Sequence, residues 1–447
     1  MKRILLVSAN REHFPSPVFP LSLAYIAGAL ERQGVAVRIF DAGLYRFPHR
    51  ELRKELATFD PHAVGLSIRN IDNASYPSTQ FYVPGHMSLV DTIRSRSSVP
   101  VILGGSGFSL FPGELMELAR ADAGVTGEGE AETMCFLNDG GNGIFPGKAV
   151  LPEEISFPSN MDKTFPRFRN YRTIGIQTAR GCPSKCIYCT YPLIEGRRVR
   201  RRPPEAVAEE VAFLNRKFSR RDFFIVDSLF NSDEGHMCGV LEAIARRGLD
   251  TSLSCYMKPK VSDASVFDLL RRAGCVAVDF GTDSGSGKVL HSLRKGFGVD
   301  DVVNASQACR RAGVEFCHSL LFGAPGESSE TIQETIELMD RLNPKAVIAM
   351  TGIRLYPGAE LTSMALVEGR LPTAQSLLEP QFYFSDMEPP VLVREVGGRA
   401  AGRPNWFFPG LRNWSGALGP RLLRLIHRKG PLWLRLRPNR NIYVTGG

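Results

Sequence analysis

Short apolar segments alternate with amphipathic ones along most of this chain, and this alternation constrains the fold more than any other feature. Residues 4–8, 35–41 and 63–67 have the length and apolar character of buried strands, and apolar residues between them recur at helical spacing. Strands that alternate with helices form parallel sheets, because each helical crossover returns the chain to the same edge. The sequence therefore predicts an α/β fold.

The alternation occurs in two series, which predict two α/β domains and an extension. Residues 1–137 predict a Rossmann-like doubly wound sheet, whose ligand should lie beyond the carboxyl ends of the strands. Residues 138–170 are rich in Gly, Pro and Asn and predict a linker. Residues 171–360 contain six strand–helix units, which predict a partial (β/α)6 barrel, and residues 361–447 follow as a C-terminal extension.

The formal charge of +9 is concentrated at one end of the chain. Residues 396–447 contain ten basic residues, no acidic residue and all three tryptophans, so the remainder is nearly neutral. This distribution argues against nucleic-acid binding by the whole surface. No uncharged apolar run approaches the roughly 20 residues of a membrane span, and the first residues do not resemble a signal peptide, so we expect a cytoplasmic protein.

Three of the nine cysteines form a cluster at the end of a predicted strand. Cys182, Cys186 and Cys189 have the spacing Cys-x3-Cys-x2-Cys directly after the strand expected at residues 174–179. Three thiolates can bind three irons of a 4Fe–4S cluster and leave the fourth iron open to a substrate. A structural zinc site would require a fourth ligand, usually from a second cysteine pair, and no such pair occurs; zinc and ordinary core packing remain the alternatives.

The motif Cys182-x3-Cys186-x-Tyr188-Cys189, placed at the start of a six-unit βα series, resembles the radical S-adenosylmethionine (radical SAM) superfamily. The resemblance implies that S-adenosylmethionine chelates the open iron and is cleaved to a 5′-deoxyadenosyl radical by an electron from a flavodoxin- or ferredoxin-type reductant. It also implies that Tyr188 lies against the adenine; a core-packing role is the alternative.

Later strand ends resemble the same superfamily more loosely. Residues 281–286 are similar to its Gly-Ile-Glu-Ser-Gly-Ser element, with Asp in place of Glu, and residues 321–327 are similar to its Gly-x-Pro-Gly-Glu turn. The Gly-Gly-Glu stretch expected at the second strand end is replaced by Asp-Ser, which leaves the contact to the methionine amino group open. The implied S-adenosylmethionine contacts are Tyr188, Asp227, Ser228, Asp283, Ser284, Gly323, Pro325 and Gly326.

The N-terminal series, alone a generic Rossmann-like sheet, resembles the cobalamin-binding domain that precedes many radical SAM barrels. Glycines at the strand ends would admit the corrin amides, which a side chain would block. The Asp-x-His-x-x-Gly motif is absent around His13, so we expect cobalamin without a protein ligand on its lower face. The implied cobalamin contacts are Ser67, Arg69, Asn70, Gly104, Gly105, Gly127, Glu128 and Gly129.

Two basic segments have open interpretations. The five arginines within residues 197–202 either bind phosphate, carboxylate or cobalamin amides, or form a solvated charged run. Residues 422–437 alternate basic and apolar residues and either lie on an anionic membrane surface, cover the barrel mouth, or simply pack on the protein.

Together these features predict a cobalamin-dependent radical SAM enzyme that methylates an unactivated carbon of a small-molecule or lipid-like substrate. The first alternative is a radical cyclisation or carbon-skeleton rearrangement without net methylation. The second is a cobalamin- or iron–sulfur-based sensor, which has no need of an open iron. The sequence identifies no residue that quenches or relays the radical.

Overall fold

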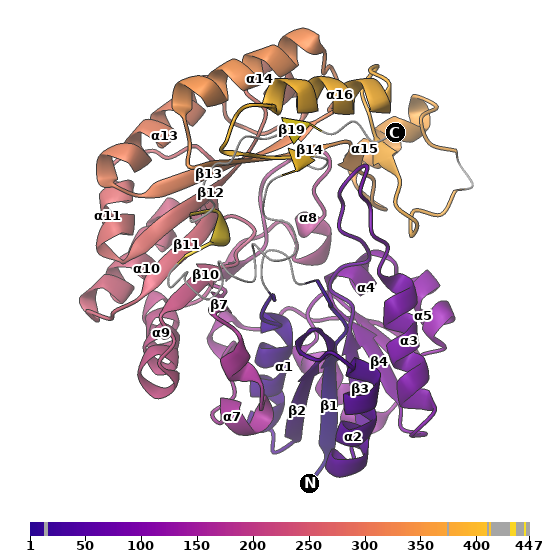
Figure 1. The fold of residues 1–447 in the computed structure, drawn as a ribbon. Helices are drawn as coiled ribbons and strands as arrows, with labels where there is room; N and C mark the ends of the chain where they lie inside the picture. The colour runs from indigo at the N-terminus through magenta and orange to yellow at the C-terminus, as the bar shows by residue number, and fades with distance from the viewer. Residues whose placement is uncertain (13–16, 373–374, 409–410, 413–429, 435–441, 444–447) are drawn as a thin grey trace. The chain divides into compact units, whose positions relative to one another are not determined.

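The computed structural model describes the chain apart from residues 13–16, 373–374, 409–410, 413–429, 435–441 and 444–447 (Figure 1). The chain divides into two compact units. The first contains Met1–Asn73 and Phe81–Ile174, and the second contains Ala74–Gln80 and Gly175–Gly447.

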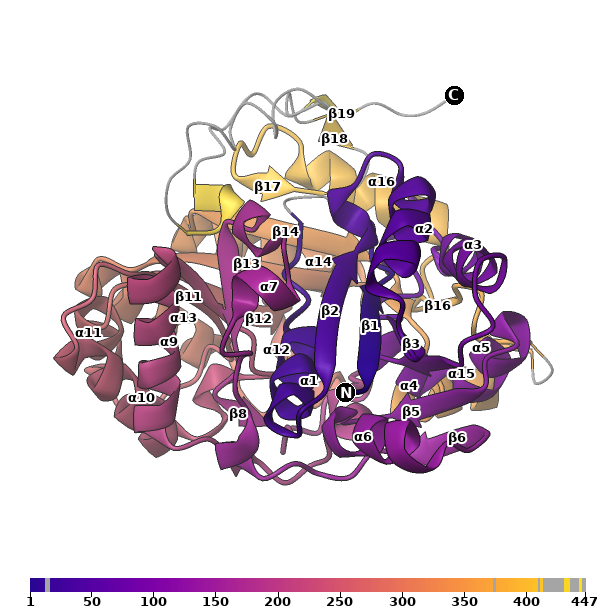
Figure 2. The ribbon, with the colours of Figure 1, turned by 90° about the horizontal axis from the view of Figure 1, so that it is seen from below.

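The first unit is built on a six-stranded parallel sheet with the order β2-β1-β3-β4-β5-β6. Figure 2 shows β2 and β1 side by side. The residues of β1 from Ile4 to Val7 are at most 2% exposed, as expected for a strand covered by helices on both faces. The strands are β1 (Arg3–Ser8), β2 (Ala36–Asp41), β3 (Ala63–Ser67), β4 (Val101–Gly104), β5 (Ala123–Thr126) and β6 (Gly143–Pro146). The helices are α1 (Leu21–Arg32), α2 (Pro48–Phe59), α3 (Val83–Arg94), α4 (Ser106–Leu110), α5 (Pro112–Ala119) and α6 (Glu130–Asp139).

The order in which the chain adds strands to this parallel sheet reverses at β1, because β2 lies on one side of β1 and β3 on the other. Ligands of open parallel sheets bind beyond the carboxyl ends of the strands at such a switch point. The register aligns Ser8 with Ser67, and Ser67 with Gly104. Two of the predicted cobalamin contacts, Ser67 and Gly104, therefore occupy adjacent positions at this edge.

Residues 138–170, expected to be a linker, belong to the first unit. They contribute β6 and the short helix α7 (Met161–Thr164). Phe157, Phe165 and Phe168 surround Phe19 with ring centroids 5.8, 6.2 and 5.9 Å away. The high Gly and Pro content of residues 138–170 masks the periodicity by which these short elements could be predicted. The aromatic contacts to Phe19 attach the segment to the first unit.

The second unit is a seven-stranded sheet with the order β17-β14-β13-β12-β11-β10-β7, which confirms the predicted βα series as an open partial barrel. Helices α9, α10, α11, α13 and α14 flank its outer face in Figure 1. The strands are β7 (Thr173–Ile176), β10 (Asp222–Ile225), β11 (Ser252–Met257), β12 (Cys275–Asp283), β13 (Glu315–Phe322), β14 (Ala346–Thr351) and β17 (Trp406–Phe407). The helices are α9 (Pro204–Phe218), α10 (Glu234–Arg246), α11 (Val266–Arg272), α12 (Gly287–Ser292), α13 (Val299–Ala312) and α14 (Ser329–Leu342).

Shorter elements complete the second unit. Three antiparallel pairs form in the described residues, between β8 and β9, between β15 and β16, and between β18 (Leu411–Arg412) and β19 (Ile442–Tyr443). These remaining elements are β8 (Ala179–Arg180), α8 (Tyr191–Ile194), β9 (Arg200–Arg201), β15 (Ile353–Arg354), α15 (Glu360–Val367), β16 (Phe382–Tyr383) and α16 (Pro389–Ala400).

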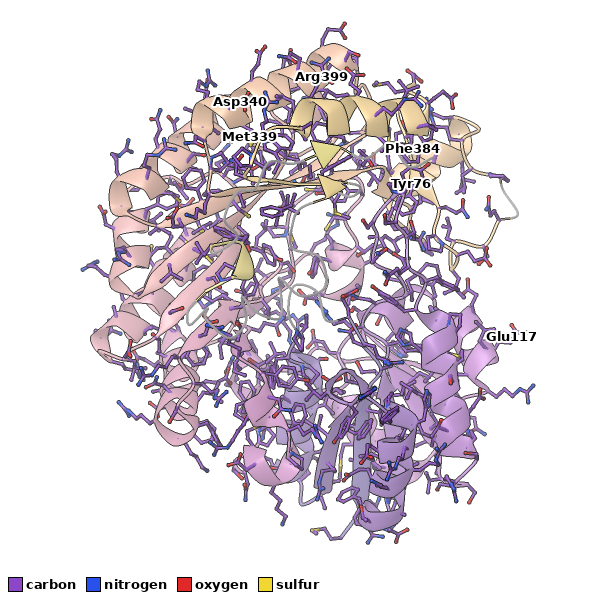
Figure 3. The ribbon with its side chains drawn as sticks, viewed as in Figure 1. Tyr76, Glu117, Met339, Asp340, Phe384 and Arg399 are labelled. Atoms are coloured by element: carbon purple, nitrogen blue, oxygen red, sulfur yellow. The ribbon has the colours of Figure 1, made fainter. Side chains whose placement is uncertain are left out.

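A short segment between β3 and α3 belongs to the second unit rather than the first. Tyr76 forms an antiparallel bridge with Thr351 at the end of β14, and the Thr351 hydroxyl donates to the Tyr76 carbonyl at 3.3 Å. The Tyr76 ring packs edge-on against Phe384, with centroids 4.9 Å apart (Figure 3). The chain thus leaves the first unit after Asn73, contacts the carboxyl end of β14, and re-enters the first unit at Phe81.

Two of the three tail tryptophans pack into the barrel. Trp406 lies in β17 and is 1% exposed, and Trp433 is 7% exposed and packs with Ala277, Cys317 and Ala346 near the amino ends of their strands. Trp414 and residues 422–426 lie outside the described residues. The described part of the tail therefore supports packing over a cover for the barrel mouth, and no described helix is long and apolar enough to cross a membrane.

Candidate functional site

The cysteine loop follows β8 and is held by backbone hydrogen bonds. Gly181 has a φ of +98°, and a Cβ there would lie 2.3 Å from the Arg198 carbonyl oxygen, so only glycine allows this close approach. The Cys182 amide donates to the Gly196 carbonyl at 3.0 Å, and the Cys189 amide donates to the Cys186 carbonyl at 3.2 Å. The sequence therefore builds a fixed loop that carries all three thiols.

The three thiols are shielded from solvent, Cys182 fully and the other two partly. Burial raises the pKa of Cys186, and it raises the pKa of Cys189 to about 12. The positive charge of Lys295 acts on both thiols in the opposite direction. A buried cation beside three thiols fits a centre whose bound thiolates carry negative charge.

No three His, Cys, Asp or Glu side chains among the described residues converge on a position for a single metal ion. In an iron–sulfur cluster each thiolate binds a different iron, so the cysteines surround the cluster rather than meet at one point. The donor set of Cys182, Cys186 and Cys189 therefore fits a cluster.

Tyr188, Asp283 and Lys295 form a buried polar triad beside the cysteine loop. Lys295 Nζ lies 2.6 Å from Asp283 Oδ2, and the Tyr188 hydroxyl donates to the same oxygen at 2.5 Å. Burial raises the pKa of Tyr188, and the Asp283 carboxylate adds to this effect. Burial alone would lower the pKa of Lys295, but the neighbouring acidic groups outweigh it and the net shift is upward. The triad therefore holds a protonated lysine and a neutral phenol.

A β-bulge positions Asp283 in this triad. The register between β12 and β13 shifts between Gly281 and Asp283, and Asp283 adopts a φ of +67°. Strained backbone of this kind is concentrated at functional sites because surrounding contacts must maintain it. The predicted contacts Tyr188 and Asp283 are thus brought together, and Lys295 joins them as a residue that the sequence did not single out as a contact.

The carboxylate of Asp227, one of the predicted S-adenosylmethionine contacts, forms hydrogen bonds within the protein. Its carboxylate accepts the Thr178 amide at 2.6 Å and the Thr178 hydroxyl, and it is 3% exposed. Burial raises the pKa of Asp227 to about 7. Asp227 therefore fixes the turn between β7 and β8, from which the cysteine loop begins.

Glu195 is a partly buried carboxylate that the sequence did not indicate as a site residue. Its carboxylate accepts the Ser228 hydroxyl at 2.9 Å, the Gly181 amide at 3.1 Å and the Gln177 side-chain amide at 3.3 Å. It connects the end of β10 to the start of the cysteine loop. No local pattern marks this residue, because its partners lie 14 to 33 residues away in the sequence.

The remaining predicted S-adenosylmethionine contacts lie just after β12 and β13, and hydrogen bonds from neighbouring side chains hold them in place. The Ser284 hydroxyl is buried and interacts with the Thr335 hydroxyl at 3.1 Å. Gly323 and Gly326 have φ values of +98° and +80°, and the Pro325 carbonyl accepts the Ser292 hydroxyl at 2.7 Å. The Glu327 carboxylate accepts the Gly323 amide at 3.3 Å, and burial raises the pKa of Glu327 to about 7.

The arginine segment is partly buried and partly exposed: Arg202 is buried, whereas Arg197, Arg198 and Arg201 are exposed. Arg202 is buried and forms a two-point ion pair with Glu210 at 3.0 and 2.9 Å. Arg197 donates to the Ser184 carbonyl at 3.2 Å, and Arg201 pairs with Asp233 at 2.5 Å. These contacts give structural roles to arginines for which the sequence also suggested anion binding.

The predicted cobalamin contacts differ in what surrounds them. A Cβ at Gly104 would approach only the Val125 carbonyl oxygen, at 3.7 Å, whereas a Cβ at Gly105 would lie 2.6 Å from the Ile68 carbonyl oxygen. Gly104 thus leaves an open strand end that fits a bulky cofactor, and Gly105 serves close backbone packing. Arg69 is exposed, and its carbonyl accepts the Ser106 hydroxyl at 2.9 Å.

The last predicted cobalamin contacts lie after β5. The Gly127 amide donates to the Ser109 hydroxyl at 2.9 Å, and the Glu128 carboxylate accepts the Val150 amide at 2.9 Å. A Cβ at Gly129 would lie 3.2 Å from Ile26. The Asn70 carbonyl lies 2.8 Å from His86 Nε2, while His13 is outside the described residues.

Two family models match this chain. The radical SAM superfamily model covers residues 176–339, and the B12 binding domain model covers residues 7–134. The chain is a cobalamin-binding radical SAM protein. The 4Fe–4S cluster, S-adenosylmethionine and cobalamin are accordingly its cofactors, and the expected family and fold class are confirmed.

Relatives of this radical SAM protein include named methyltransferases. It is 25% identical over 438 residues to a tryptophan 2-C-methyltransferase of Streptomyces laurentii, covering 79% of this chain and 73% of the relative. It is 26% identical to a hopanoid C-3 methylase of Methylococcus capsulatus, covering 68% of this chain and 60% of the relative.

The fold also matches a solved structure over nearly its full length. The radical SAM methyltransferase TsrM of Kitasatospora setae, solved with tryptophan and a SAM analogue, superposes with a TM-score of 0.85 at 22% identity. The match covers 98% of this chain and 97% of that one. At this identity the likeness establishes the shared fold.

Proposed function

We propose that this radical SAM protein methylates a carbon atom of a small-molecule substrate, with a one-electron reductant as its partner. The observation that carries the proposal is the buried Tyr188–Asp283–Lys295 triad beside the cysteine loop, in a chain that also contains a B12-binding sheet. Two relatives named for methylation of carbon support it.

The residues of the chain have separable tasks in this proposal. When bound, the cofactors supply radical chemistry at the cluster and a transferable methyl group at cobalamin. Cys182, Cys186 and Cys189 would hold three irons, while Glu195 and the triad would orient S-adenosylmethionine beside the fourth. Because Lys295 keeps its proton next to the thiols, it would offset the negative charge of the cysteine-bound centre.

The described tail gives no support to a lipid-like substrate or to membrane contact. Those expectations rested on the basic, Trp-containing segment, and Trp433 is buried against the barrel strands. We therefore assign Trp406 and Trp433 a packing role and propose a small-molecule substrate.

The test follows the methyl group without requiring the substrate to be known. The full-length protein is reconstituted anaerobically with iron, sulfide and hydroxocobalamin and incubated with S-[methyl-13C]adenosylmethionine and dithionite. We expect 13C in the cobalamin fraction and formation of S-adenosylhomocysteine, both measured by mass spectrometry. 5′-Deoxyadenosine without any S-adenosylhomocysteine would contradict methylation and favour the rearrangement alternative.

A matched pair of cysteine variants tests the cluster assignment. Cys186→Ala should lose at least half of the bound iron and all reductive cleavage of S-adenosylmethionine. Cys238→Ala changes a half-buried cysteine on α10 and should behave as the wild type. Equal iron content and equal cleavage of S-adenosylmethionine in the two variants would show that Cys186 is not a cluster ligand.

A further inference from the structure

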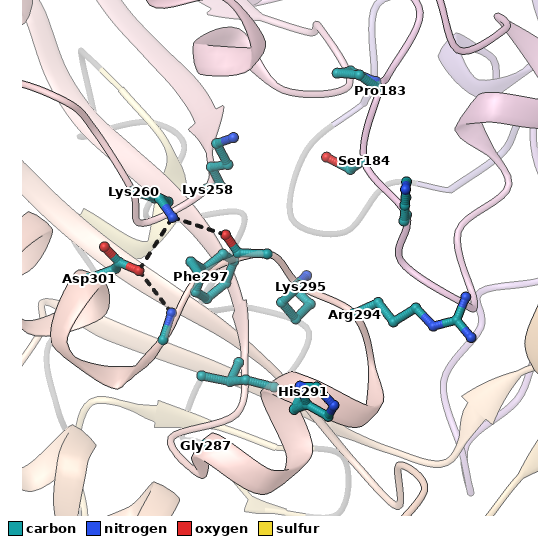
Figure 4. Close-up of a pocket in the computed structure, with 14 residues that line it drawn as sticks. Pro183, Ser184, Lys258, Lys260, Gly287, His291, Arg294, Lys295, Phe297 and Asp301 are labelled. Atoms are coloured by element: carbon teal, nitrogen blue, oxygen red, sulfur yellow. Dashed lines mark hydrogen bonds and ion pairs between the residues drawn. The ribbon is translucent and has the colours of Figure 1, made fainter.

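A basic basin opens beside the cysteine loop in the second unit. The cavity measures about 940 Å³, and five cationic side chains line it against a single carboxylate, Asp301 (Figure 4). The cations are Lys185, Lys258, Lys260, Arg294 and Lys295. A concave surface with this excess of one charge raises the local concentration of partners of opposite charge.

One wall of the basin is the cysteine loop itself. Pro183, Ser184 and Lys185 line the cavity, and these three residues separate Cys182 from Cys186. Whatever occupies the basin therefore contacts the chain between two of the proposed iron ligands.

The opposite wall is held in place by a buried asparagine. Asn231 is 1% exposed, and its side-chain amide donates to the Lys258 and Lys260 carbonyls, each at 2.9 Å. Its carbonyl oxygen accepts the Lys258 amide at 3.0 Å. These three bonds fix the Lys258-Pro259-Lys260 turn through its backbone, so the lysine side chains can change without loss of the turn.

Much of the positive charge in the basin is available to a partner. Neither Lys185 nor Lys258 forms an ion pair with any residue in the described part of the chain, and Lys260 is 4.0 Å from Asp301. Arg294 forms an exposed pair with Glu360, which contributes little in water. Lys295 lies deeper and pairs with Asp283 of the triad.

This inference rests on the proposed function: we propose that the basic basin is the docking surface for an acidic electron-carrier protein that reduces the cluster. One electron leaves the carrier and enters the cluster, and no bond forms or breaks in this step. Electron-transfer encounters bury little surface and depend on complementary charge, which suits a shallow site with exposed lysines on its rim. The carrier would rest against residues 183–185, next to the iron ligands.

Charge reversal in the basin tests the proposal with a flavodoxin as the carrier. We compare the holoenzyme with Lys258→Glu/Lys260→Glu, and use Arg341→Glu/Lys345→Glu as the control. The control residues are exposed at the amino end of β14, opposite the strand end that leads to the cysteine loop. Isothermal titration calorimetry gives Kd for oxidised flavodoxin, and anaerobic stopped-flow absorbance gives the rate of cluster reduction by flavodoxin hydroquinone.

In 50 mM salt, we expect the basin variant to have an at least tenfold higher Kd for flavodoxin and an at least tenfold lower rate of cluster reduction by it. Both quantities should depend less on ionic strength than in the wild type. The control should stay within twofold of the wild type, and dithionite should reduce all three proteins equally. The single variant Lys185→Glu should show a smaller loss of the same kind.

Equal flavodoxin binding and reduction rates in the wild type and the basin variant would overturn the docking site. Tight, saturable binding of inorganic pyrophosphate that leaves the Kd for flavodoxin unchanged would also overturn it, and would assign the basin to a small anion. A failure of the proposed function is distinguishable, because it would appear as an absence of S-adenosylhomocysteine with dithionite as the reductant, whether or not flavodoxin binds the basin.

Discussion

Lys295 Nζ lies 2.6 Å from Asp283 Oδ2, and both side chains are nearly excluded from solvent. The two residues come from opposite ends of the turn around α12, and the bulge in β12 turns Asp283 toward the lysine. A buried ion pair of this kind is costly to break, because the remaining charge loses its partner without regaining water.

The variant Asp283→Asn should therefore lower the free energy of unfolding by about 3–5 kcal/mol. It should also weaken binding of S-adenosylmethionine, since Tyr188 and Lys295 lose their shared acceptor. Urea unfolding and equilibrium dialysis measure the two effects. The double variant Asp283→Leu/Lys295→Met should recover much of the stability but none of the binding. Full stability in the single variant would contradict an ionised pair.

Replacement of Glu195 should affect the site more than the fold. Glu195→Ala removes the acceptor for the Ser228 hydroxyl and the Gly181 amide, so the start of the cysteine loop loses support. We expect roughly tenfold weaker S-adenosylmethionine binding and a lower iron content, measured by equilibrium dialysis and by iron analysis. Glu205→Ala, which removes an exposed partner of Arg247, is the matched control and should change neither quantity.

The pKa of Asp227 predicts a specific dependence of stability on pH. Its pKa is raised from 3.8 to about 7, so between these values the folded chain holds a proton that the unfolded chain has released. The folded state then binds more protons, and this group reduces stability as the pH rises from about 4 to about 7.

Asp227→Asn should remove that dependence while keeping an acceptor for the Thr178 amide. Urea unfolding at pH 4.5 and pH 7 should show the variant gaining stability relative to the wild type at the higher pH. The gain should be on the order of a few kcal/mol. A constant difference between the two proteins at both pH values would mean that Asp227 is ionised throughout.

Adjacent glycines in the first unit should respond differently to the same change. Gly105→Ala places a Cβ 2.6 Å from the Ile68 carbonyl oxygen at a φ of +101°, so it should destabilise the cobalamin-free protein by more than about 1 kcal/mol. Gly104→Ala meets nothing closer than 3.7 Å, so it should leave the cobalamin-free protein stable and weaken cobalamin retention. Thermal unfolding and the absorbance of retained cobalamin distinguish the two, and identical behaviour would contradict this assignment.

Trp433→Ala should destabilise the barrel by about 3–5 kcal/mol, because it empties a buried site between Ala277, Cys317 and Ala346. Trp433→Phe should retain most of the stability. Differential scanning calorimetry measures both. If the alanine variant unfolds as the wild type does but loses binding to anionic phospholipid vesicles, the membrane interpretation of the tail would replace the packing one.

The positions of the cysteines and of several strands could be predicted, because their signals are local. The periodicity of residues 4–8 and 63–67 predicted strands close to the observed β1 and β3, and Cys182, Cys186 and Cys189 lie in one loop as their spacing predicted. Residues 138–170 lack such a periodic pattern, and aromatic packing on Phe19 decides their structure. No local pattern indicates that Thr178 donates to the Asp227 carboxylate.

The sequence by itself determined the α/β class, the two series of elements and the placement of the three candidate thiols in one loop, since each depends on neighbouring residues. Only the tertiary structure decided that Lys295 meets Asp283, that Glu195 bridges β10 and the cysteine loop, and that Trp433 enters the barrel. These contacts join distant positions. They depend on the register and curvature of the sheet and on which buried polar groups need hydrogen-bond partners. No local sequence pattern encodes these two properties.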